Sequence, residues 1–302
     1  MTERQTLSYL QQRFASARIQ PQTRFGQNFL IDLNLIEMIA NTAEISSRDV
    51  VLEVGTGMGS LTTIMAQKAG HVVTVEIDHH LAPLAEQEFS ELENVTLLQV
   101  DALKNKNSLN DEVIRVVQEK VAEIRGGRLK LVANLPYNVA TPILSNLLDI
   151  EPYPTRMVAT IQKELGDRIV AQPRCRDYSA LSVWMQAQCK TEVVRVMSPA
   201  VFWPRPRVES AIIDIQPQKL LRQRIGDVEH FHKLVRAIFL HRRKFLRSAL
   251  FSAVKPDLTK PDVDAVLEQM GFGADVRAEQ LTPTQMIELA SLVKQKLDAG
   301  NV

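Results

Sequence analysis

The sequence holds 302 residues, of which 45% are hydrophobic and 24% charged, as in a globular protein with one large and one small domain. No apolar run approaches the length of a membrane span, and the two cysteines, Cys175 and Cys189, indicate a reducing compartment without a disulfide framework. Residues 153–250 carry 18 Lys and Arg against 8 Asp and Glu, which suits a polyanion such as RNA, although such faces are often only solvated surface.

The first 22 residues contain Arg4, Arg13 and Arg18 with a single acid, Glu3, a composition that overlaps with organelle transit peptides. We favour an N-terminal extension of a cytoplasmic protein. Residues 23–30 are too polar and too interrupted by glycine for a core strand, and a helix is predicted over 33–42. The cysteine spacing and the scattered histidines match no zinc pattern, so we expect no metal.

Residues 50–148 alternate between short apolar runs and helical patterns. The expected strands and helices are, in chain order, 50–54, 61–69, 72–75, 81–89, 95–100, 129–133 and 143–148. This alternation predicts a parallel sheet with helices on both faces. Further apolar runs follow at 156–161, 192–197 and 211–215, and we expect the last two to be strands.

The C-terminal part changes to helical periodicity after a polar passage at 216–226, which we interpret as a linker. Between residues 231 and 250 the apolar side chains share one face, and the opposite face carries Lys233, Arg236, Arg243 and Arg247. Arg242 points toward the apolar side and should need a partner. Shorter helices are expected over 263–270 and 284–297.

Three glycines at alternate positions, Gly55, Gly57 and Gly59, follow the apolar run at 50–54. Without Cβ atoms, such a turn can bend sharply and let a ligand lie against its backbone. A nicotinamide fingerprint needs its third glycine where this chain has Ser60, which argues against a dinucleotide site. An ordinary strand-to-helix turn remains the alternative.

Candidate ligand-binding residues follow four of the predicted strands, and open α/β sheets bind ligands beyond these strand ends. The residues are Gly55, Glu76, Asp101 and Asn134. Glu76 lies where a carboxylate can accept hydrogen bonds from ribose hydroxyls, and Asp101 could accept from an adenine amino group. Any one such acid could be only a helix cap, but four in register favour a nucleoside site.

The segment Asn134-Leu135-Pro136-Tyr137 offers the groups needed to methylate an adenine amine. Two acceptors on its N–H groups, the Asn134 side-chain carbonyl and the Leu135 backbone carbonyl, would favour a pyramidal nitrogen. Pro136 restrains Leu135 to an extended conformation. Tyr137 could stack on an extruded base, and the alternative is a plain Asn-Pro turn.

The stretch Phe202-Trp203-Pro204-Arg205-Pro206-Arg207-Val208 combines aromatic rings with arginines on a proline-stiffened loop. That composition suits stacking a base and holding phosphates, and it also suits a rigid turn between antiparallel strands.

These motifs together resemble the ribosomal RNA adenine N6-dimethyltransferases, most closely the bacterial small-subunit group. The resemblance runs from residue 24 to about residue 247 and includes the motifs 24–30, 53–59, 75–78, 101–103, 134–141, 162–164, 202–210 and 242–244. It implies a Rossmann-like class I methyltransferase sheet with a smaller C-terminal all-helical domain. The expected division is an extension over 1–22, a methyltransferase domain over 23–218 and an RNA-binding helical domain over 219–302.

By this resemblance, the cofactor is S-adenosylmethionine and the substrate is two adjacent adenosines in the 3′-terminal hairpin loop of small-subunit rRNA, on the pre-30S particle. The implied cofactor contacts are Gln27, Asn28, Leu30, Gly55, Gly57, Glu76, Ile77, Asp101, Ala102 and Asn134. The implied holders of the target adenine are Asn134, Leu135, Tyr137 and, as a second stacking surface, Phe202. The candidate RNA contacts are Arg205, Arg207, Arg236, Arg243, Lys244 and Arg247. We expect a monomer with no membrane partner.

The resemblance also has departures and alternatives. The interval from Asp101 to Asn134 is longer than usual and holds a charged helical insert at 108–124. The competing functions are a non-enzymatic nucleic-acid binder on the same fold and a large-subunit rRNA adenine methylase, which usually carries isoleucine in place of Leu135. DNA adenine methylation usually goes with a proline at that position.

Overall fold

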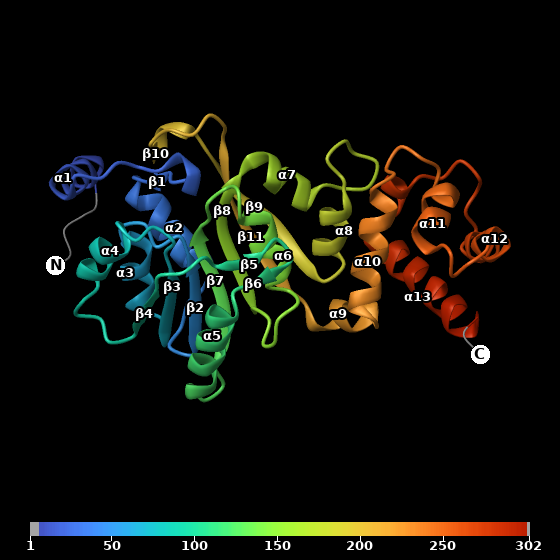
Figure 1. Ribbon diagram of the computed structural model, residues 1–302, viewed down its shortest axis with the longest axis horizontal. Coiled ribbons are helices and arrows are strands. Elements are labelled where there is room, and N and C mark those ends of the chain that lie inside the picture. Colours follow the sequence, from blue (N-terminus) through green and yellow to red (C-terminus); the bar gives the residue numbers. More distant parts are fainter. Residues whose placement is uncertain (1–5, 301–302) are drawn as a thin grey trace. The chain divides into compact units, whose positions relative to one another are not determined.

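Within residues 6–300, the part of the chain that the structure describes, a seven-stranded sheet forms the centre of the fold (Figure 1). In this computed structural model the strand order is β4-β3-β2-β7-β8-β11-β9. These strands span, in that order, Val95–Leu98, His71–Val75, Asp49–Val54, Arg128–Asn134, Arg156–Gln162, Ser210–Pro217 and Cys189–Met197. Strands β4, β3, β2, β7 and β8 are parallel, and β11 is antiparallel to β8. The predicted parallel sheet is confirmed over these five strands.

Short strands and the helices complete the described chain. The short strands are β1 (Phe29–Leu30), which pairs with β10 (Phe202–Trp203), and β5 (Leu103–Asn105), which pairs with β6 (Ser108–Leu109). The α-helices are α1 (Leu7–Ala17), α2 (Leu33–Thr42), α3 (Ser60–Ala66), α4 (Ala82–Glu88), α5 (Asp111–Glu123), α6 (Ala140–Asn146), α7 (Lys163–Val170), α8 (Ala180–Gln186), α9 (Lys219–Ile225), α10 (Val228–Phe239), α11 (Leu246–Val254), α12 (Lys260–Gln269) and α13 (Pro283–Gly300).

The strands around β2 are buried on both sides, which explains why most of their residues are apolar. Val51 packs in one cluster with residues of α2 and α3. Val50 and Leu52 point to the opposite face and are also buried, and α5 contacts β2, β3 and β7. Most of the charged stretch at 108–124 therefore forms a helix, α5, that covers the sheet, and the exposed face of this helix carries the charge.

The chain divides into two compact units whose bounds differ from the predicted linear division. The first unit runs to Gly166 and resumes over Glu192–Gln216; the second comprises Asp167–Thr191 and the chain from Pro217 onward. The segment 167–191, assigned to the sheet domain on sequence grounds, thus belongs with the C-terminal helices. The described part of the expected extension at 1–22 contains α1, which buries Leu10 and Phe14 within the first unit.

The second unit has a helical core of its own. The Trp184 ring of α8 stacks on His232 of α10 with centroids 4.0 Å apart. The Tyr178 hydroxyl donates a 2.8 Å hydrogen bond to the Leu281 carbonyl. These contacts explain why residues 167–191 cluster with this unit, because an apolar run in the sequence does not show which core it joins.

Two expectations for the C-terminal part are wrong. The polar passage at 216–226 is not a linker, because it forms the helix α9. The helical pattern over 231–250 is two helices, since α10 ends at Phe239 and α11 begins at Leu246. Between them Arg242 donates 2.7 Å to Glu279 and also binds the carbonyls of Cys175 and Arg176, which supplies the partner that its position requires.

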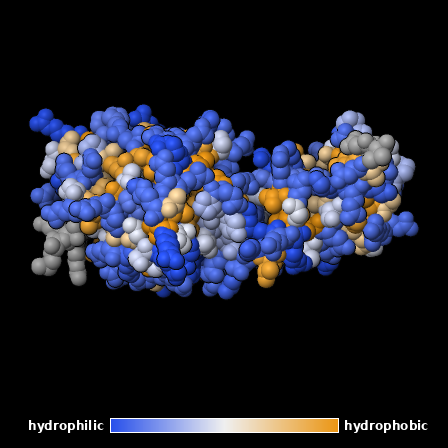
Figure 2. Space-filling model, turned by 90° about the horizontal axis from the view of Figure 1, so that it is seen from below, coloured by the Kyte–Doolittle hydropathy of each residue, from blue (hydrophilic) through white to orange (hydrophobic). Residues whose placement is uncertain are grey.

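Among residues 6–300, no helix is both long enough and apolar enough to cross a membrane. The face drawn in Figure 2 is mainly hydrophilic, with hydrophobic residues in separate patches.

Candidate active site

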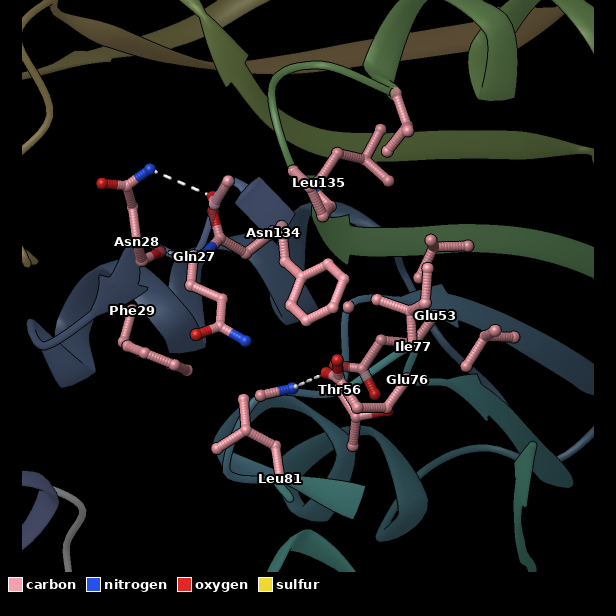
Figure 3. Close-up of a pocket in the computed structure, with 18 of the residues that line it drawn as sticks. Gln27, Asn28, Phe29, Glu53, Thr56, Glu76, Ile77, Leu81, Asn134 and Leu135 are labelled. Carbon is pink, nitrogen blue, oxygen red and sulfur yellow. Dashed lines mark hydrogen bonds between the residues drawn. The ribbon is translucent and has the colours of Figure 1, made fainter. Parts of the chain in front are cut away.

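A cavity of about 340 Å³ lies in the first unit at the carboxyl ends of β2, β3 and β7 (Figure 3). All the residues predicted to contact the cofactor line it, namely Gln27, Asn28, Leu30, Gly55, Gly57, Glu76, Ile77, Asp101, Ala102 and Asn134. Leu135 and Tyr137 line the same cavity, whereas Phe202 does not. The sheet thus brings the predicted donor site and the predicted base site together.

The glycine turn between β2 and α3 has the backbone conformation that its sequence requires. Gly55, Gly57 and Gly59 have φ angles of +88°, +58° and +79°. A Cβ atom on Gly55 would lie 3.3 Å from Pro136 Cδ, and one on Gly57 would lie 3.3 Å from the Phe29 ring. The missing side chains therefore leave the backbone bare where it borders the cavity.

Glu53, the next-to-last residue of β2, lies beneath this glycine turn and is 1% exposed. One of its carboxyl oxygens accepts hydrogen bonds from the Thr62 hydroxyl at 2.5 Å and the Thr74 hydroxyl at 2.6 Å. Burial raises the pKa of Glu53 to about 8, and the two hydroxyl donors oppose that rise. The carboxyl group is therefore largely protonated at neutral pH.

Glu76 follows β3 and is held by backbone donors on both oxygens. Gly57 N–H donates to Oε2 at 3.0 Å, and Asp78 N–H donates to Oε1 at 3.0 Å. Burial raises the pKa of Glu76, and these donors oppose the rise because they stabilise the charged form. The carboxylate is fixed at the cavity wall, where its remaining lone pairs can accept hydroxyl donors.

Asp101 and Ile77 line the cavity from its exposed side. Asp101 is exposed, and its side chain accepts a 2.9 Å hydrogen bond from Leu103 N–H. Asp101 therefore stabilises a turn, and it also borders the cavity, where its predicted role as an acceptor stays a prediction. Ile77 is 42% exposed, which leaves an apolar surface for a flat ring.

Asn134 ends β7, and its amide is held in one orientation. Its Nδ2 donates a 2.9 Å hydrogen bond to the Asn28 carbonyl. This contact leaves the amide oxygen Oδ1 as the acceptor that Asn134 can offer to a ligand. Leu135 is buried, and its N–H donates to the Thr160 carbonyl at 3.2 Å. The Tyr137 hydroxyl lies 2.6 Å from Ser210 Oγ, and burial raises the pKa of this tyrosine.

The structure does not support the expectation that Phe202 stacks on the target base. Its ring is 1% exposed and packs in the core cluster of α2 and the central strands. Phe202 lies in β10 opposite Leu30, so its burial follows from a strand pair that joins residues distant in the sequence. A ring in this position has no face available to a ligand.

The helix α1 contributes to the cavity wall, which the sequence interpretation missed. Leu10 lines the cavity, and the Phe14 ring packs edge-on against Phe29 with centroids 5.3 Å apart. Arg13 pairs with Glu88 of α4 at 3.3 Å. The i, i+4 spacing of Leu10 and Phe14 was the available signal for a buried face.

The candidate RNA contacts are exposed but divide between the two units. Arg205 and Arg207 lie on the loop before β11 in the first unit. In the second unit, Arg236 lies on α10, and Arg243 and Lys244 lie between α10 and α11. Arg247 makes a two-armed ion pair with Asp264, with Nη2 and Oδ2 2.7 Å apart.

The residues around the cavity fit S-adenosylmethionine. The bare glycine backbone allows the amino-acid portion of the cofactor to approach closely. The fixed Glu76 carboxylate can accept hydrogen bonds from two ribose hydroxyls. Ile77 and Ala102 offer apolar surface, and Asp101 offers an acceptor for an adenine amino group. Among the described residues, no group of three or more His, Cys, Asp or Glu side chains could hold a metal ion.

Comparison with known proteins agrees with this geometry. The family model described as ribosomal RNA adenine dimethylase matches residues 18–295. The small-subunit rRNA methyltransferase A of Lachnoclostridium phytofermentans is 36% identical over 91% of this chain and 92% of its own length. That of Ligilactobacillus salivarius is 38% identical over 90% of each chain. A dimethyladenosine transferase structure from Plasmodium falciparum, 22% identical, superimposes with a TM-score of 0.71 over 88% of this chain and 97% of its own.

The family match covers nearly the whole sequence, and the structural match confirms the Rossmann-like methyltransferase fold. Enzymes of this family take their methyl groups from S-adenosylmethionine. The chain therefore belongs to the ribosomal RNA adenine dimethylase family.

Proposed function

We propose that this protein methylates N6 of two adjacent adenosines in the 3′-terminal hairpin loop of small-subunit rRNA, acting as a monomer in the cytoplasm on the pre-30S particle. As a family member it is an S-adenosylmethionine-dependent rRNA adenine dimethyltransferase. The observation that best supports the proposal is that one cavity holds both Glu76 and the Asn134-Leu135 acceptors. The names of the relatives support small-subunit rRNA as the substrate.

The donor side of the cavity would hold the cofactor through the chain's own fixed groups. Glu76 accepts hydrogen bonds from the ribose hydroxyls, and Asp101 accepts one from the adenine amino group. Because Gly55 and Gly57 lack side chains, the amino-acid end of the cofactor can lie against their backbone. When bound, the cofactor supplies a methyl group on a positively charged sulfur. The neutral, protonated form of Glu53 keeps an extra negative charge away from the floor of this site.

The acceptor side would hold the extruded adenine by its amino group. Asn134 Oδ1 and the Leu135 carbonyl accept its two N–H donors, which favours the pyramidal nitrogen that attack requires. The Asn134–Asn28 hydrogen bond supports this role, because it fixes which end of the amide faces the base. The Tyr137 ring, held by Ser210, supplies the stacking surface.

The exposed arginines would hold the RNA backbone. Arg205 and Arg207 lie on the unit that contains the cavity, and Arg236, Arg243 and Lys244 lie on the helical unit. Each phosphate contact should contribute to a steep dependence of affinity on salt. Arg247 would have to leave Asp264 to join them, so we expect it to contribute least.

A methyl-transfer assay on undermethylated small subunits tests the proposal. We expect the wild-type protein to label small-subunit rRNA, and Asn134→Ala to abolish labelling. Removing one preorganised hydrogen-bonding group from a reacting centre, as measured for oxyanion-hole donors, costs about 100-fold or more in rate. Tyr137→Ala should lose transfer and keep cofactor affinity. Tyr153→Ala, outside the cavity, is the matched control.

The outcomes discriminate between the functions. Full activity of Tyr137→Ala would remove its stacking role. Label in large-subunit rRNA would select the large-subunit methylase, and cofactor-independent RNA binding without transfer would select the non-enzymatic binder. Mapping of the labelled adenosines tests the hairpin-loop assignment.

A further inference from the structure

We infer that the segment 22–28 couples the cofactor site to the base site through two positioning residues, Gln27 and Asp78. The inference rests on the proposed function for the identity of the two ligands. It concerns a chain of hydrogen bonds that begins at the ribose-binding carboxylate and ends at the amide that would hold the target adenine.

The chain of hydrogen bonds begins at its cofactor end with the contact between Asp78 and the Glu76 carboxylate. The Asp78 N–H donates to Glu76 Oε1 at 3.0 Å, and Asp78 is 3% exposed. Its two side-chain oxygens accept from His80 N–H at 3.0 Å and from Gln27 Nε2 at 2.8 Å. Because both oxygens accept, Asp78 requires a donor at the position of Gln27 Nε2.

Gln27 carries the connection into the segment. Its Oε1 accepts from Gln22 N–H at 2.6 Å while its Nε2 donates to Asp78. Both ends of the amide are therefore engaged with protein groups. Gln27 lines the cavity, and these two hydrogen bonds let its amide hold the segment in place.

The base end of the chain begins at the next residue. The Asn28 carbonyl accepts from Asn134 Nδ2 at 2.9 Å, and Asn28 Nδ2 donates to the Gly26 carbonyl at 3.1 Å. Gly26 has a φ of +66°, and a Cβ atom on it would lie 3.1 Å from Asn138 Oδ1 and 3.6 Å from Pro136 Cβ. The segment thus lies against the loop that carries the base-binding groups.

The two ligands consequently share one structural element. A cofactor that fixes Glu76 also fixes the Asp78 peptide, which binds Glu76 through its N–H. Asp78 in turn holds Gln27. Gln27 precedes Asn28, whose carbonyl orients the amide of Asn134. Bound adenine would restrain the same contacts from the other end. Coupling of this kind is reciprocal, so each ligand raises the affinity of the other by the same factor.

Reversing the polarity of the Gln27–Asp78 bond provides a specific test. Gln27→Glu places two carboxylates together, and Asp78→Asn places an amide N–H₂ against either His80 N–H or Gln27 Nε2. The double variant restores the chain, because the new amide at position 78 donates to the new carboxylate at position 27. The other oxygen of that carboxylate still accepts from Gln22 N–H, and the amide oxygen at position 78 accepts from His80 N–H. The summed charge of the pair is unchanged.

Two readouts do not depend on the RNA substrate. We expect S-adenosylhomocysteine to slow amide hydrogen exchange over residues 22–28 in the wild type, and each single variant to lose this protection. By calorimetry, each single variant should bind S-adenosylhomocysteine about ten-fold more weakly, the effect of losing one charge-assisted hydrogen bond, and the double variant should recover to within about three-fold of the wild type. Asp111→Asn, an exposed exchange of the same type, is the control.

A third readout measures the coupling itself. The affinity for undermethylated small subunits is measured with and without S-adenosylhomocysteine, and the ratio should exceed one in the wild type, fall toward one in the single variants and recover in the double. Gln27→Ala, which removes the bond without placing two acids together, repeats the test if Gln27→Glu does not fold.

The inference would be overturned if the single variants bound S-adenosylhomocysteine as tightly as the wild type. It would also be overturned if the loss of affinity in the double variant equalled the sum of the losses in the two single variants. Failure of the wild type to methylate small-subunit rRNA would instead count against the proposed function and leave the exchange and calorimetry results interpretable.

Discussion

The buried carboxyl group of Glu53 should make the stability of the protein depend on pH in a way that one substitution removes. Burial raises its folded-state pKa to about 8 from the ordinary value of 4.5. Between these two values the folded chain holds a proton that the unfolded chain releases. Its contribution to stability is therefore complete below pH 4.5 and is lost as the pH rises toward 8.

The size of the effect follows from the linkage relation. One proton costs about 1.36 kcal/mol per pH unit, and the folded chain has released half of this proton at pH 8. The free energy of unfolding should therefore fall by about 2 kcal/mol between pH 6 and pH 8 from this group. Glu53→Gln keeps an acceptor oxygen for the hydroxyls of Thr62 and Thr74 and cannot ionise. Its curve of stability against pH should lack this component, and the variant should be the more stable protein at pH 9.

Differential scanning calorimetry of the wild type and Glu53→Gln from pH 5.5 to pH 9.5 measures the difference directly. The difference between the melting temperatures of the two proteins should change by roughly 5–10 °C from one end of this range to the other. Glu119→Gln, which alters an exposed ion pair with Arg115, should follow the wild type throughout. Parallel curves for the wild type and Glu53→Gln would refute the reasoning, because they would mean that Glu53 ionises as readily in the folded chain as in the unfolded one.

Three further predictions concern the glycine turn, α1 and the helical unit. Gly55→Ala should lower the free energy of unfolding by about 1–3 kcal/mol and weaken cofactor binding. The reason is that alanine would have to adopt a φ of +88° with its Cβ 3.3 Å from Pro136 Cδ. A cofactor affinity equal to that of the wild type, measured by calorimetry, would contradict this. Phe14→Ala should cost about 3–5 kcal/mol and speed proteolytic cleavage within residues 7–17, and an unchanged cleavage rate would show that α1 does not depend on this ring. Glu279→Gln should lower the free energy of unfolding in urea by about 1 kcal/mol, because Arg242 keeps its two carbonyl partners but loses its carboxylate partner. The same exchange at the exposed Glu268, Glu268→Gln, is the control.

Much of the sheet and the cavity could be predicted from local pattern. Runs such as 50–54 and 129–133 are mainly apolar because their strands are buried on both faces, and parallel strands bring the residues after them to one edge. This is why Glu76 and Asn134, 58 positions apart in the chain, were expected to meet and do line one cavity. The roles assigned to them stay predictions.

The errors arise where distant segments decide the outcome. The loop at 202–208 shows aromatic rings and arginines, but only the pairing of Phe202 with Leu30 shows that the ring is buried. The break between α10 and α11 is fixed by contacts of Arg242 and by the hydrogen bond from Leu246 N–H to the Val276 carbonyl. Helical periodicity continues across that break, so no local signal marked it.

The position of α1 also affects how the protein should be prepared for study. A recombinant chain shortened to begin at residue 23 would remove Leu10 from the wall of the cavity and uncover the apolar side chains of Phe29 and Met58. Water would then reach the cavity from that side, and the new apolar surface would favour aggregation. Measurements of cofactor affinity on such a shortened protein would describe a different, more open cavity.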